Sequence, residues 1–278
     1  MHFLRGFNNK EVIMESREIL LYLAVKYKGD WDQIYMDLSG HKEIDEKEAK
    51  TLISKVKSNY LTILDEEYPE SLRDTYKSPF VLFYYGDISL LSDKNNKIAV
   101  VGSRKYSEYG QEMTEMLVKG IAKDFVIISG MAYGIDAIAH RTAIENGGKT
   151  IGVLGNGIDF HYLEENKDLY EECKKNHLII SEYPGTTPPN QKYFPVRNRI
   201  IAGLCYNLLV TEGKIKSGTQ ITAFLMVQKS GNVCCVPARA GEESICNYLI
   251  KEGAYLVETA EDIYIATDVV QQKPIFEK

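Results

Sequence analysis

The chain is short of the residues that mark secreted, membrane-bound or metal-binding proteins. Cysteine occurs five times in 278 residues, an odd number, and never with C-x-x-C spacing. A disulfide framework or structural zinc site is therefore not expected. The sequence has no run of about 18 apolar residues and no N-terminal apolar segment of the signal-peptide type. We expect a cytoplasmic protein with no membrane attachment.

Several motifs of nucleotide-binding and hydrolytic enzymes are also missing. The dinucleotide pattern G-x-G-x-x-G fails because the next glycine after Gly102 is Gly110, and no Walker A sequence is present. No G-x-S-x-G elbow, H-E-x-x-H pair or acidic metal cluster can be found. We therefore predict a protein without cofactor, metal site or catalytic residues, and not an enzyme.

Positive charge is in the minority, with 33 Lys and Arg against 39 Asp and Glu and a net charge of −6. The whole molecule is not expected to attract nucleic acid over long distances, so any such site must be a local basic patch. Hydrophobic residues make up 44% and charged residues 26%, as in ordinary globular proteins. The length fits one large domain, or a large domain with a small companion.

The order of apolar segments predicts an α/β protein. Helical spacing occurs over residues 12–28, 31–38 and 45–59, which indicates a small helical module at the front. Two extended pieces follow, at 60–64 and 80–85. Six short apolar runs then alternate with mostly helical patterns, at 97–101, 125–129, 150–154, 178–181, 207–211 and 232–236. This alternation predicts a doubly wound, largely parallel sheet. Residues 271–278 have the character of a loose tail.

Polar and glycine-rich loops follow the predicted strands, where a doubly wound sheet binds its ligands. Ser103, Arg104 and Ser107 come after the first strand and open a helix, whose N-terminus attracts anions. Gly130 and Gly134 follow the second strand and either admit a ligand to the backbone or allow tight strand-to-helix packing. Asn156 follows the third strand.

Two of these loops have competing interpretations. Asp136 and His140 share a helix face, which permits a catalytic pair but more often reflects capping and hydrogen bonding. Ser217 and Thr219 open a later helix, flanked by Lys214 and Lys216. They fit an anion site and ordinary N-caps equally well.

The segment 193–203 has the clearest chemistry for nucleic acid. Arg197 and Arg199 are planar forks suited to phosphate, Asn198 can donate and accept, and Phe194 offers a face for stacking. Tyr106, Tyr133 and Tyr193 add rings on which bases could stack, although each ring taken alone more often belongs to packing.

Taken together, the motifs resemble the DprA/Smf family of bacterial DNA-processing proteins. They are Gly102-Ser103-Arg104, Ser129-Gly130-x-Ala132-x-Gly134-Ile135-Asp136-x-x-Ala139-His140, Ser181-Glu182-Tyr183-Pro184, Phe194-Pro195-x-Arg197-Asn198-Arg199-Ile200-Ile201 and Ser217-Gly218-Thr219-x-x-Thr222-Ala223. The resemblance runs from about residue 60 to about residue 264 and covers the helical front more loosely.

The resemblance implies a SAM-like helical module over residues 1–75 and an extended Rossmann-like DNA-binding domain over 76–278. It also implies a homodimer that binds single-stranded DNA, protects incoming DNA and loads the RecA recombinase during natural transformation. Arg197, Asn198 and Arg199 would either touch the strand or hold the pocket. The DNA-binding residues expected are Gly102, Ser103, Arg104, Ser107, Gly130, Gly134, Asn156, Lys167, Phe194, Arg197, Asn198, Arg199, Ser217, Gly218 and Thr219.

The chain departs from the family pattern in two places. Members often have Tyr-Pro followed by a basic residue before the asparagine of the third loop, whereas this chain has Tyr162-Leu163-Glu164-Glu165-Asn166-Lys167, so one positive contact is weakened or moved to Lys167. Only 14 residues follow Tyr264, so we expect no C-terminal winged-helix domain. The alternative function is a nucleoside monophosphate phosphoribohydrolase of a related Rossmann-like group. Its P-G-G-x-G-T-x-x-E glutamate has no counterpart in Lys216-Ser217-Gly218-Thr219-Gln220-Ile221-Thr222.

Overall fold

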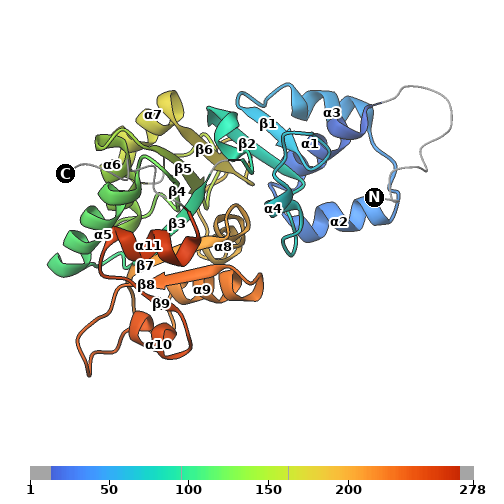
Figure 1. Cartoon of the computed structure of the whole chain (residues 1–278). Helices are drawn as coiled ribbons and strands as arrows, with labels where there is room; N and C mark the ends of the chain where they lie inside the picture. The colour runs from blue at the N-terminus through green and yellow to red at the C-terminus, as the bar shows by residue number, and fades with distance from the viewer. Residues whose placement is uncertain (1–13, 95, 162, 270–278) are drawn as a thin grey trace.

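Strands and helices alternate through most of the computed structural model, which describes residues 14–94, 96–161 and 163–269 (Figure 1). Within these ranges the strands form one nine-stranded, mostly parallel sheet with helices on both faces. The predicted α/β, extended Rossmann-like fold with a helical front is confirmed. Positions 12 and 13 of the first predicted helix and the predicted tail at 271–278 lie outside the described residues.

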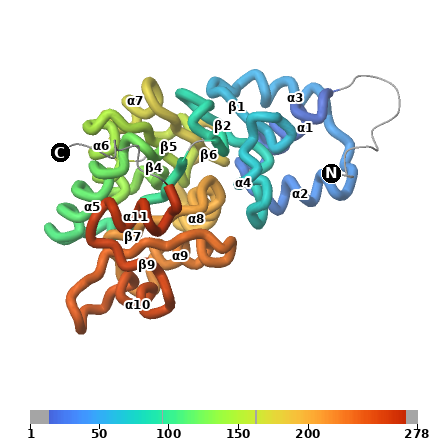
Figure 2. Tube along the Cα trace, viewed as in Figure 1, coloured from blue at the N-terminus to red at the C-terminus, as the bar shows by residue number. Residues whose placement is uncertain are grey.

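The front of the chain contains α1 (Ser16–Lys26), α2 (Trp31–Ser39) and α3 (Glu46–Ile53). Asp30 caps α2 by accepting a hydrogen bond from the Gln33 amide at 3.1 Å, and Asp45 caps α3 in the same way. The third predicted helix was too long, because it ends at Ile53 and residue 59 already begins a strand. These helices lie beyond one edge of the sheet, beside β1 and β2 (Figures 1 and 2).

The sheet has the strand order β1-β2-β6-β5-β4-β3-β7-β8-β9. β1 and β2 pair with each other in antiparallel fashion, and β2 pairs antiparallel with β6, whereas the remaining neighbours are parallel. The strands are β1 (Asn59–Thr62), β2 (Val81–Gly86), β3 (Lys97–Gly102), β4 (Val126–Ser129), β5 (Lys149–Leu154), β6 (Leu178–Ser181), β7 (Asn207–Glu212), β8 (Asn232–Cys235) and β9 (Tyr255–Leu256). All six predicted strands are present, and both extended pieces overlap sheet strands.

Helices cover both faces of the sheet because its strands are apolar on both sides. Ala99 and Val101 of β3 pack toward α8 and α9, while Ile98 and Val100 pack toward α5 and α6.

No helix of the described ranges is both long and apolar enough to cross a bilayer. The remaining helices are α4 (Glu70–Arg73), α5 (Glu108–Ile121), α6 (Ile135–Glu145), α7 (Lys167–Asn176), α8 (Tyr193–Gly203), α9 (Gly218–Gln228), α10 (Ile245–Lys251) and α11 (Ala260–Thr267), with 3-10 turns at Ile88–Leu91 and Glu164–Asn166.

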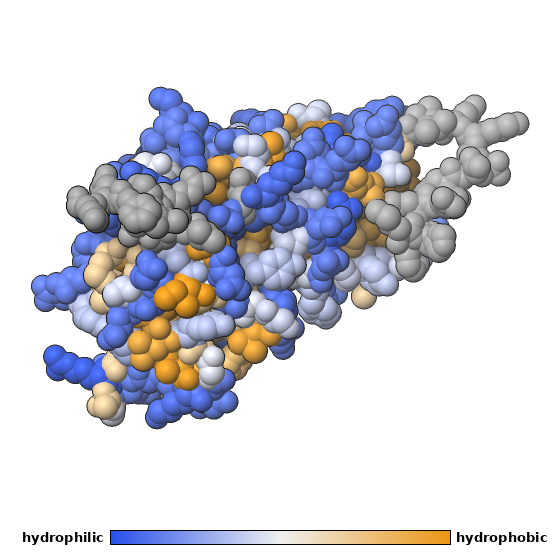
Figure 3. Space-filling model, viewed as in Figure 1, coloured by the Kyte–Doolittle hydropathy of each residue, from blue (hydrophilic) through white to orange (hydrophobic). Residues whose placement is uncertain are grey.

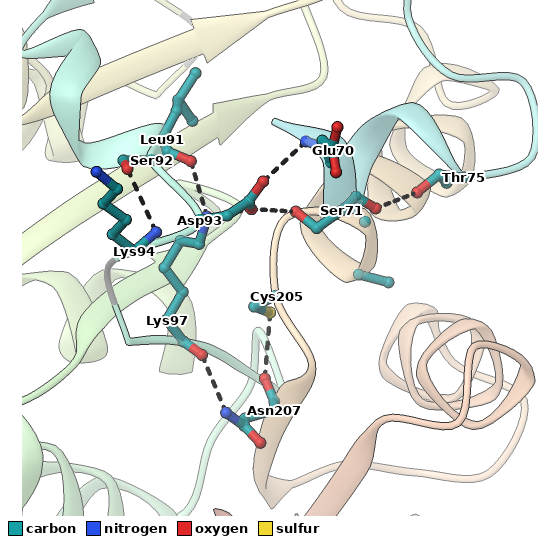
Figure 4. Close-up of polar contacts among 12 residues, drawn as sticks. Glu70, Ser71, Thr75, Leu91, Ser92, Asp93, Lys94, Lys97, Cys205 and Asn207 are labelled. Atoms are coloured by element: carbon teal, nitrogen blue, oxygen red, sulfur yellow. Dashed lines mark hydrogen bonds and ion pairs between the residues drawn. The ribbon is translucent and has the colours of Figure 1, made fainter. Parts of the chain in front are cut away.

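A buried lysine and one aspartate fasten the start of α4 to β3 (Figure 4). Asp93 accepts hydrogen bonds from the Glu70 amide and the Ser71 hydroxyl, both at 2.8 Å, and forms an ion pair of 3.1 Å with Lys97. Lys97 also donates to the Leu91 carbonyl at 2.8 Å. The segment between the front helices and β3 is therefore anchored to the sheet. The domain boundary between residues 75 and 76 stays a prediction. β1 lies before that boundary, although it belongs to the same sheet as the later strands.

The strand order reverses next to β3. The chain continues from β3 outward through β4, β5 and β6, and then returns to place β7 on the other side of β3. The helices that follow β3 and β7 pack on opposite faces of the sheet. At such a reversal the two loops diverge and leave a crevice at the carboxyl ends of the strands, which is where doubly wound folds bind ligands.

Candidate functional site

A groove of about 1000 Å³ lies at this reversal. Its walls come from the loop after β3, the first half of α8, and the loop between β7 and α9 together with the first turns of α9. A smaller cavity of about 50 Å³ adjoins it between the loops that follow β4 and β5. Arg104, Phe194 and Arg197 line both spaces, so the two form one continuous site.

The described lining of the groove is strongly basic. Arg104, Lys105, Lys214 and Lys216 are exposed there, while Asp136 is the one carboxylate of that lining and is buried. A chain of net charge −6 thus concentrates positive charge in one crevice. Low-dielectric walls strengthen the field of such charges at the groove. This is the local basic patch that a nucleic-acid site in an acidic protein requires.

The loop after β3 presents two exposed cations, Arg104 and Lys105, and uses its hydroxyls for structure. The Arg104 guanidinium carbon lies 5.2 Å from the centre of the Phe194 ring, a cation–π contact between two residues that line the groove. The Ser103 hydroxyl accepts from the Lys105 amide at 3.1 Å and donates to its carbonyl at 2.7 Å. Ser107 caps α5 and donates to Glu212. Arg104 and Lys105 are therefore the charged residues that this loop offers to a ligand.

The predicted glycines of the first two loops are required by packing. A Cβ at Gly130 would lie 2.5 Å from the Arg197 guanidinium, and one at Gly102 would lie 2.6 Å from the Ile135 side chain. Gly134 has a left-handed backbone with φ 78°, and a Cβ there would overlap the Ser103 carbonyl. The structure thus favours tight packing over ligand approach for these glycines.

Arg197 is a buried residue of α8 that links this helix to the neighbouring strands of the site. It is 4% exposed, and it donates to the Gly130 carbonyl at 2.6 Å, to the Val153 carbonyl, and to Asn198 Oδ1 at 3.1 Å. Burial lowers its pKa to about 10, with the nearby Asp136 carboxylate opposing that shift, so it remains charged at neutral pH. Arg197 thereby fastens the ends of β4 and β5 to α8. Its Nε and Nη1 donors are engaged by the protein instead of facing a phosphate.

The next two residues of α8 also act within the protein. Arg199 is 6% exposed and donates a hydrogen bond of 2.6 Å to Glu182. Burial raises the pKa of Glu182 above its ordinary value, although the charge of Arg199 opposes that shift. Asn198 donates to the Gly218 carbonyl at 3.2 Å and so joins α8 to the start of α9. For the three residues 197–199, these contacts favour the interpretation that they hold the pocket. The expectation that the arginine forks grip phosphate is not supported by their burial.

The loop after β5 contributes one exposed lysine and two buried amides. Asn156 is 3% exposed and donates to the Gly157 and Phe160 carbonyls, so it shapes the loop. Lys167 lines the smaller cavity and forms an exposed ion pair of 3.3 Å with Glu164, a contact that contributes little free energy. Asn166, which was not among the predicted DNA-binding residues, donates to the Met131 and Ala132 carbonyls at 3.3 Å and links the two loops.

The start of α9 forms the other wall of the groove. The Ser217 hydroxyl donates to the Lys214 carbonyl at 2.6 Å and makes no capping bond with the helix, while Thr219 is buried. Ser217 therefore stands at the N-cap position of α9, but its hydroxyl does not cap the helix. Gly218 is exposed, and a Cβ there would come no closer than 3.9 Å to Asn198. The first amides of α9 consequently border open space flanked by Lys214 and Lys216.

The suspected catalytic pair in α6 is used for structure. Asp136 accepts from the Gly130 amide at 3.1 Å, and burial raises its pKa. His140 is buried against the Thr150 hydroxyl at 2.5 Å, and burial lowers its pKa to about 3. His140 does not line the groove, and Asp136, which does, is held by the Gly130 amide, so the two do not form an acid–base pair there. Within the described ranges, no group of three or more His, Cys, Asp or Glu residues is arranged to hold a metal ion.

Tyr106 and Tyr133, two of the rings proposed for base stacking, are exposed on loops beside the site. Tyr106 is 44% exposed on the loop before α5, and Tyr133 is 40% exposed with its hydroxyl 2.5 Å from Glu165. Tyr193 instead stacks on Tyr183 at the start of α8, with ring centres 4.2 Å apart. Phe194, which is half-buried, and Phe224, which is 41% exposed, are the rings that line the groove, and Tyr106 and Tyr133 lie on the loops that border it.

Known proteins resemble this chain over most of its length. The sequence model of the family described as DNA recombination-mediator protein A matches residues 59–268. The DNA processing protein DprA of Streptococcus pneumoniae is 43% identical over 204 residues, which cover 73% of this chain and 72% of that protein. Its counterpart from Bacillus subtilis is 40% identical over 209 residues, covering 74% and 70% respectively.

Two solved structures are similar over most of their length. The crystal structure of DprA from Streptococcus pneumoniae has a TM-score of 0.77 at 35% identity and covers 90% of this chain and 93% of that one. A structure of DprA from Helicobacter pylori, described as revealing its single-stranded DNA binding mode, has a TM-score of 0.66 at 29% identity and covers 75% and 94%. This chain therefore belongs to the DNA recombination-mediator protein A family, also called DprA/Smf.

Proposed function

We propose that this chain binds single-stranded DNA in the groove between β3 and β7. The observation that carries the proposal is the concentration of exposed Arg104, Lys105, Lys214 and Lys216 around Phe194 at the topological reversal of an acidic protein. Backbone phosphates would be held by these cations and by the first amides of α9. Bases would stack on Phe194 and on the exposed rings of Tyr106 and Tyr133, a mode that tolerates any sequence.

A flexible single strand suits this groove better than a duplex. Stacking on a ring requires an accessible base face, which a duplex hides in its own stack, and base–ring stacking contributes about 1–3 kcal/mol per base. The single-stranded DNA binding mode described for the Helicobacter pylori protein supports the same ligand class. The test is a titration of labelled single-stranded and duplex oligonucleotides at two salt concentrations. Equal or tighter binding to the duplex would overturn the proposal.

The family description supports a role in recombination beyond binding alone. We propose that the bound strand is protected from nucleases and then transferred to the RecA recombinase during natural transformation. Contacts made through phosphates and rings, with no sequence-specific bonds, would yield as cooperative RecA contacts replace them. Nuclease digestion of a bound and an unbound oligonucleotide tests the protective part. Equal digestion rates would contradict it.

We propose a homodimer built by the last part of the domain. Exposed apolar side chains gather over α9, β9 and α11, where Figure 3 shows apolar residues side by side. Val227 is 56%, Leu256 49% and Ile265 68% exposed. Such a cluster is costly to leave in water and is typical of an interaction surface. Light scattering over a range of concentrations tests this, and a constant monomer mass would count against it.

We propose that the protein performs no covalent chemistry on DNA or nucleotides. The exposed groups that line the groove are cations, amides, hydroxyls and two rings, while its one carboxylate, Asp136, is buried and accepts from the Gly130 amide. The competing phosphoribohydrolase activity requires a glutamate that the loop 216–222 lacks. Incubation with AMP decides between the two. We expect no released adenine, and enzymatic release at a rate above the blank would establish the alternative.

A further inference from the structure

The turn between α1 and α2 presses the backbone of the helical module against the loop that follows β6. Lys28 and Gly29 both adopt left-handed backbone conformations, with φ of 51° and 77°. A Cβ at Gly29 would lie 2.6 Å from the Glu182 carbonyl oxygen and 3.0 Å from Cδ1 of Tyr183. Glycine is therefore required here by both its conformation and its surroundings, and the turn touches the loop directly.

Two contacts transmit this position to α8. The Tyr183 ring stacks on Tyr193, the first residue of α8, with centres 4.2 Å apart and planes 23° apart. Glu182 accepts from Arg199 of the same helix at 2.6 Å, and both side chains are buried. Burial and then the nearby charge of Asp30 raise the pKa of Glu182, while Arg199 lowers it. The module's turn, the loop after β6 and α8 thus meet at one buried point.

α8 is the wall on which the other parts of the groove depend. Phe194 lines the groove and lies under Arg104. Arg197 is bonded to the Gly130 carbonyl at the end of β4, and Asn198 is bonded to the Gly218 carbonyl at the start of α9. A displacement of α8 would therefore move the ring and the loops on both sides together.

We propose that the helical module positions α8 and so fixes the shape of the DNA groove. Gly29, Glu182 and Tyr183 are positioning residues in this account, which rests on the proposed function of the groove. The module contributes through preorganisation: a wall already held in place loses less freedom when the strand binds. The module's contact is thereby part of the binding site although none of its described residues lines the groove.

The test compares Gly29→Ala with Gly147→Ala. Gly147 has nearly the same left-handed backbone, with φ 75°, but a Cβ there would meet nothing within 4 Å. The pair therefore matches in φ and differs in the contact. We expect Gly29→Ala to bind a single-stranded oligonucleotide about tenfold more weakly, and Gly147→Ala to stay within about twofold of the unmodified protein. Hydrogen exchange should become faster at residues 193–199 in Gly29→Ala alone.

Two results would overturn the inference: unchanged DNA affinity in Gly29→Ala, or weaker binding with unchanged exchange at 193–199. If Gly29→Ala fails to fold, Tyr183→Leu replaces it, because this variant removes the ring stack and leaves the turn intact. The same expectations and the same contradicting results apply to it. If the unmodified protein binds no single-stranded DNA, the proposed function fails, and the exchange measurement alone decides whether the turn holds α8.

Discussion

Replacing Arg104 by alanine tests the groove through its salt dependence. If the four exposed cations Arg104, Lys105, Lys214 and Lys216 each neutralise one phosphate, the slope of log affinity against log salt is about −2.8, at about 0.7 per contact on a single strand. Loss of Arg104 then gives a slope of about −2.1. Between about 50 and 200 mM salt, affinity would fall about 50-fold for the unmodified protein but only about 20-fold for the variant.

Fluorescence anisotropy with labelled oligonucleotides of several sequences measures these slopes. The matched control is Lys123→Ala, because Lys123 is exposed but precedes β4, at the end of the sheet opposite the groove. The control should keep the unmodified slope, and Arg104→Ala should weaken binding to every sequence by a similar factor. A folded Arg104→Ala variant with an unchanged slope would refute the assignment of Arg104 to a phosphate.

Three further outcomes are expected. Arg197→Ala should lower the free energy of unfolding in urea by about 3 kcal/mol or more, because the Gly130 and Val153 carbonyls and the Asp136 charge lose their buried partner. Arg104→Ala should change the free energy of unfolding by less than about 0.5 kcal/mol, and similar values for the two variants would contradict the distinction between them. His140 has a folded pKa of about 3, below its unfolded value near 6.5, so the unfolded state binds more protons and stability should fall by about 2 kcal/mol from pH 7 to pH 5. A folded His140→Gln variant should lose that part of the pH dependence. Leu256→Lys combined with Ile265→Lys should give monomers by light scattering, and a persistent dimer would place the interface elsewhere.

Strand positions and the place of the site were predictable because they depend on local patterns. Short apolar runs marked the parallel strands, and polar loops after them marked the edge where ligands bind. The antiparallel attachment of β1 and β2 beside β6 was not predictable, because pairing between distant segments leaves no periodic signal. The two-residue strand β9 is too short to show any pattern.

The roles of individual charged residues were the hardest part to predict. Arg104 and Arg197 have the same chemistry, yet one is exposed in a loop and the other is buried in α8 beneath the loops. The sequence shows which residues carry charge, but their burial depends on how loops from β4, β5 and α9 converge on one helix. Lys105 could have been found as a second cation adjoining Arg104, whereas the bridging role of Asn166 depends on contacts 34 and 35 residues away in sequence.

Filament growth by RecA tests the proposed delivery of DNA most directly. Single-stranded DNA is first coated with single-strand-binding protein, and RecA assembly is then followed with the unmodified protein, with Arg104→Ala, or with neither. The account predicts faster filament growth with the unmodified protein and a smaller acceleration with Arg104→Ala, because the groove must hold the strand before RecA receives it. No acceleration by the unmodified protein, or cleavage of the DNA in a control that lacks RecA, would contradict it.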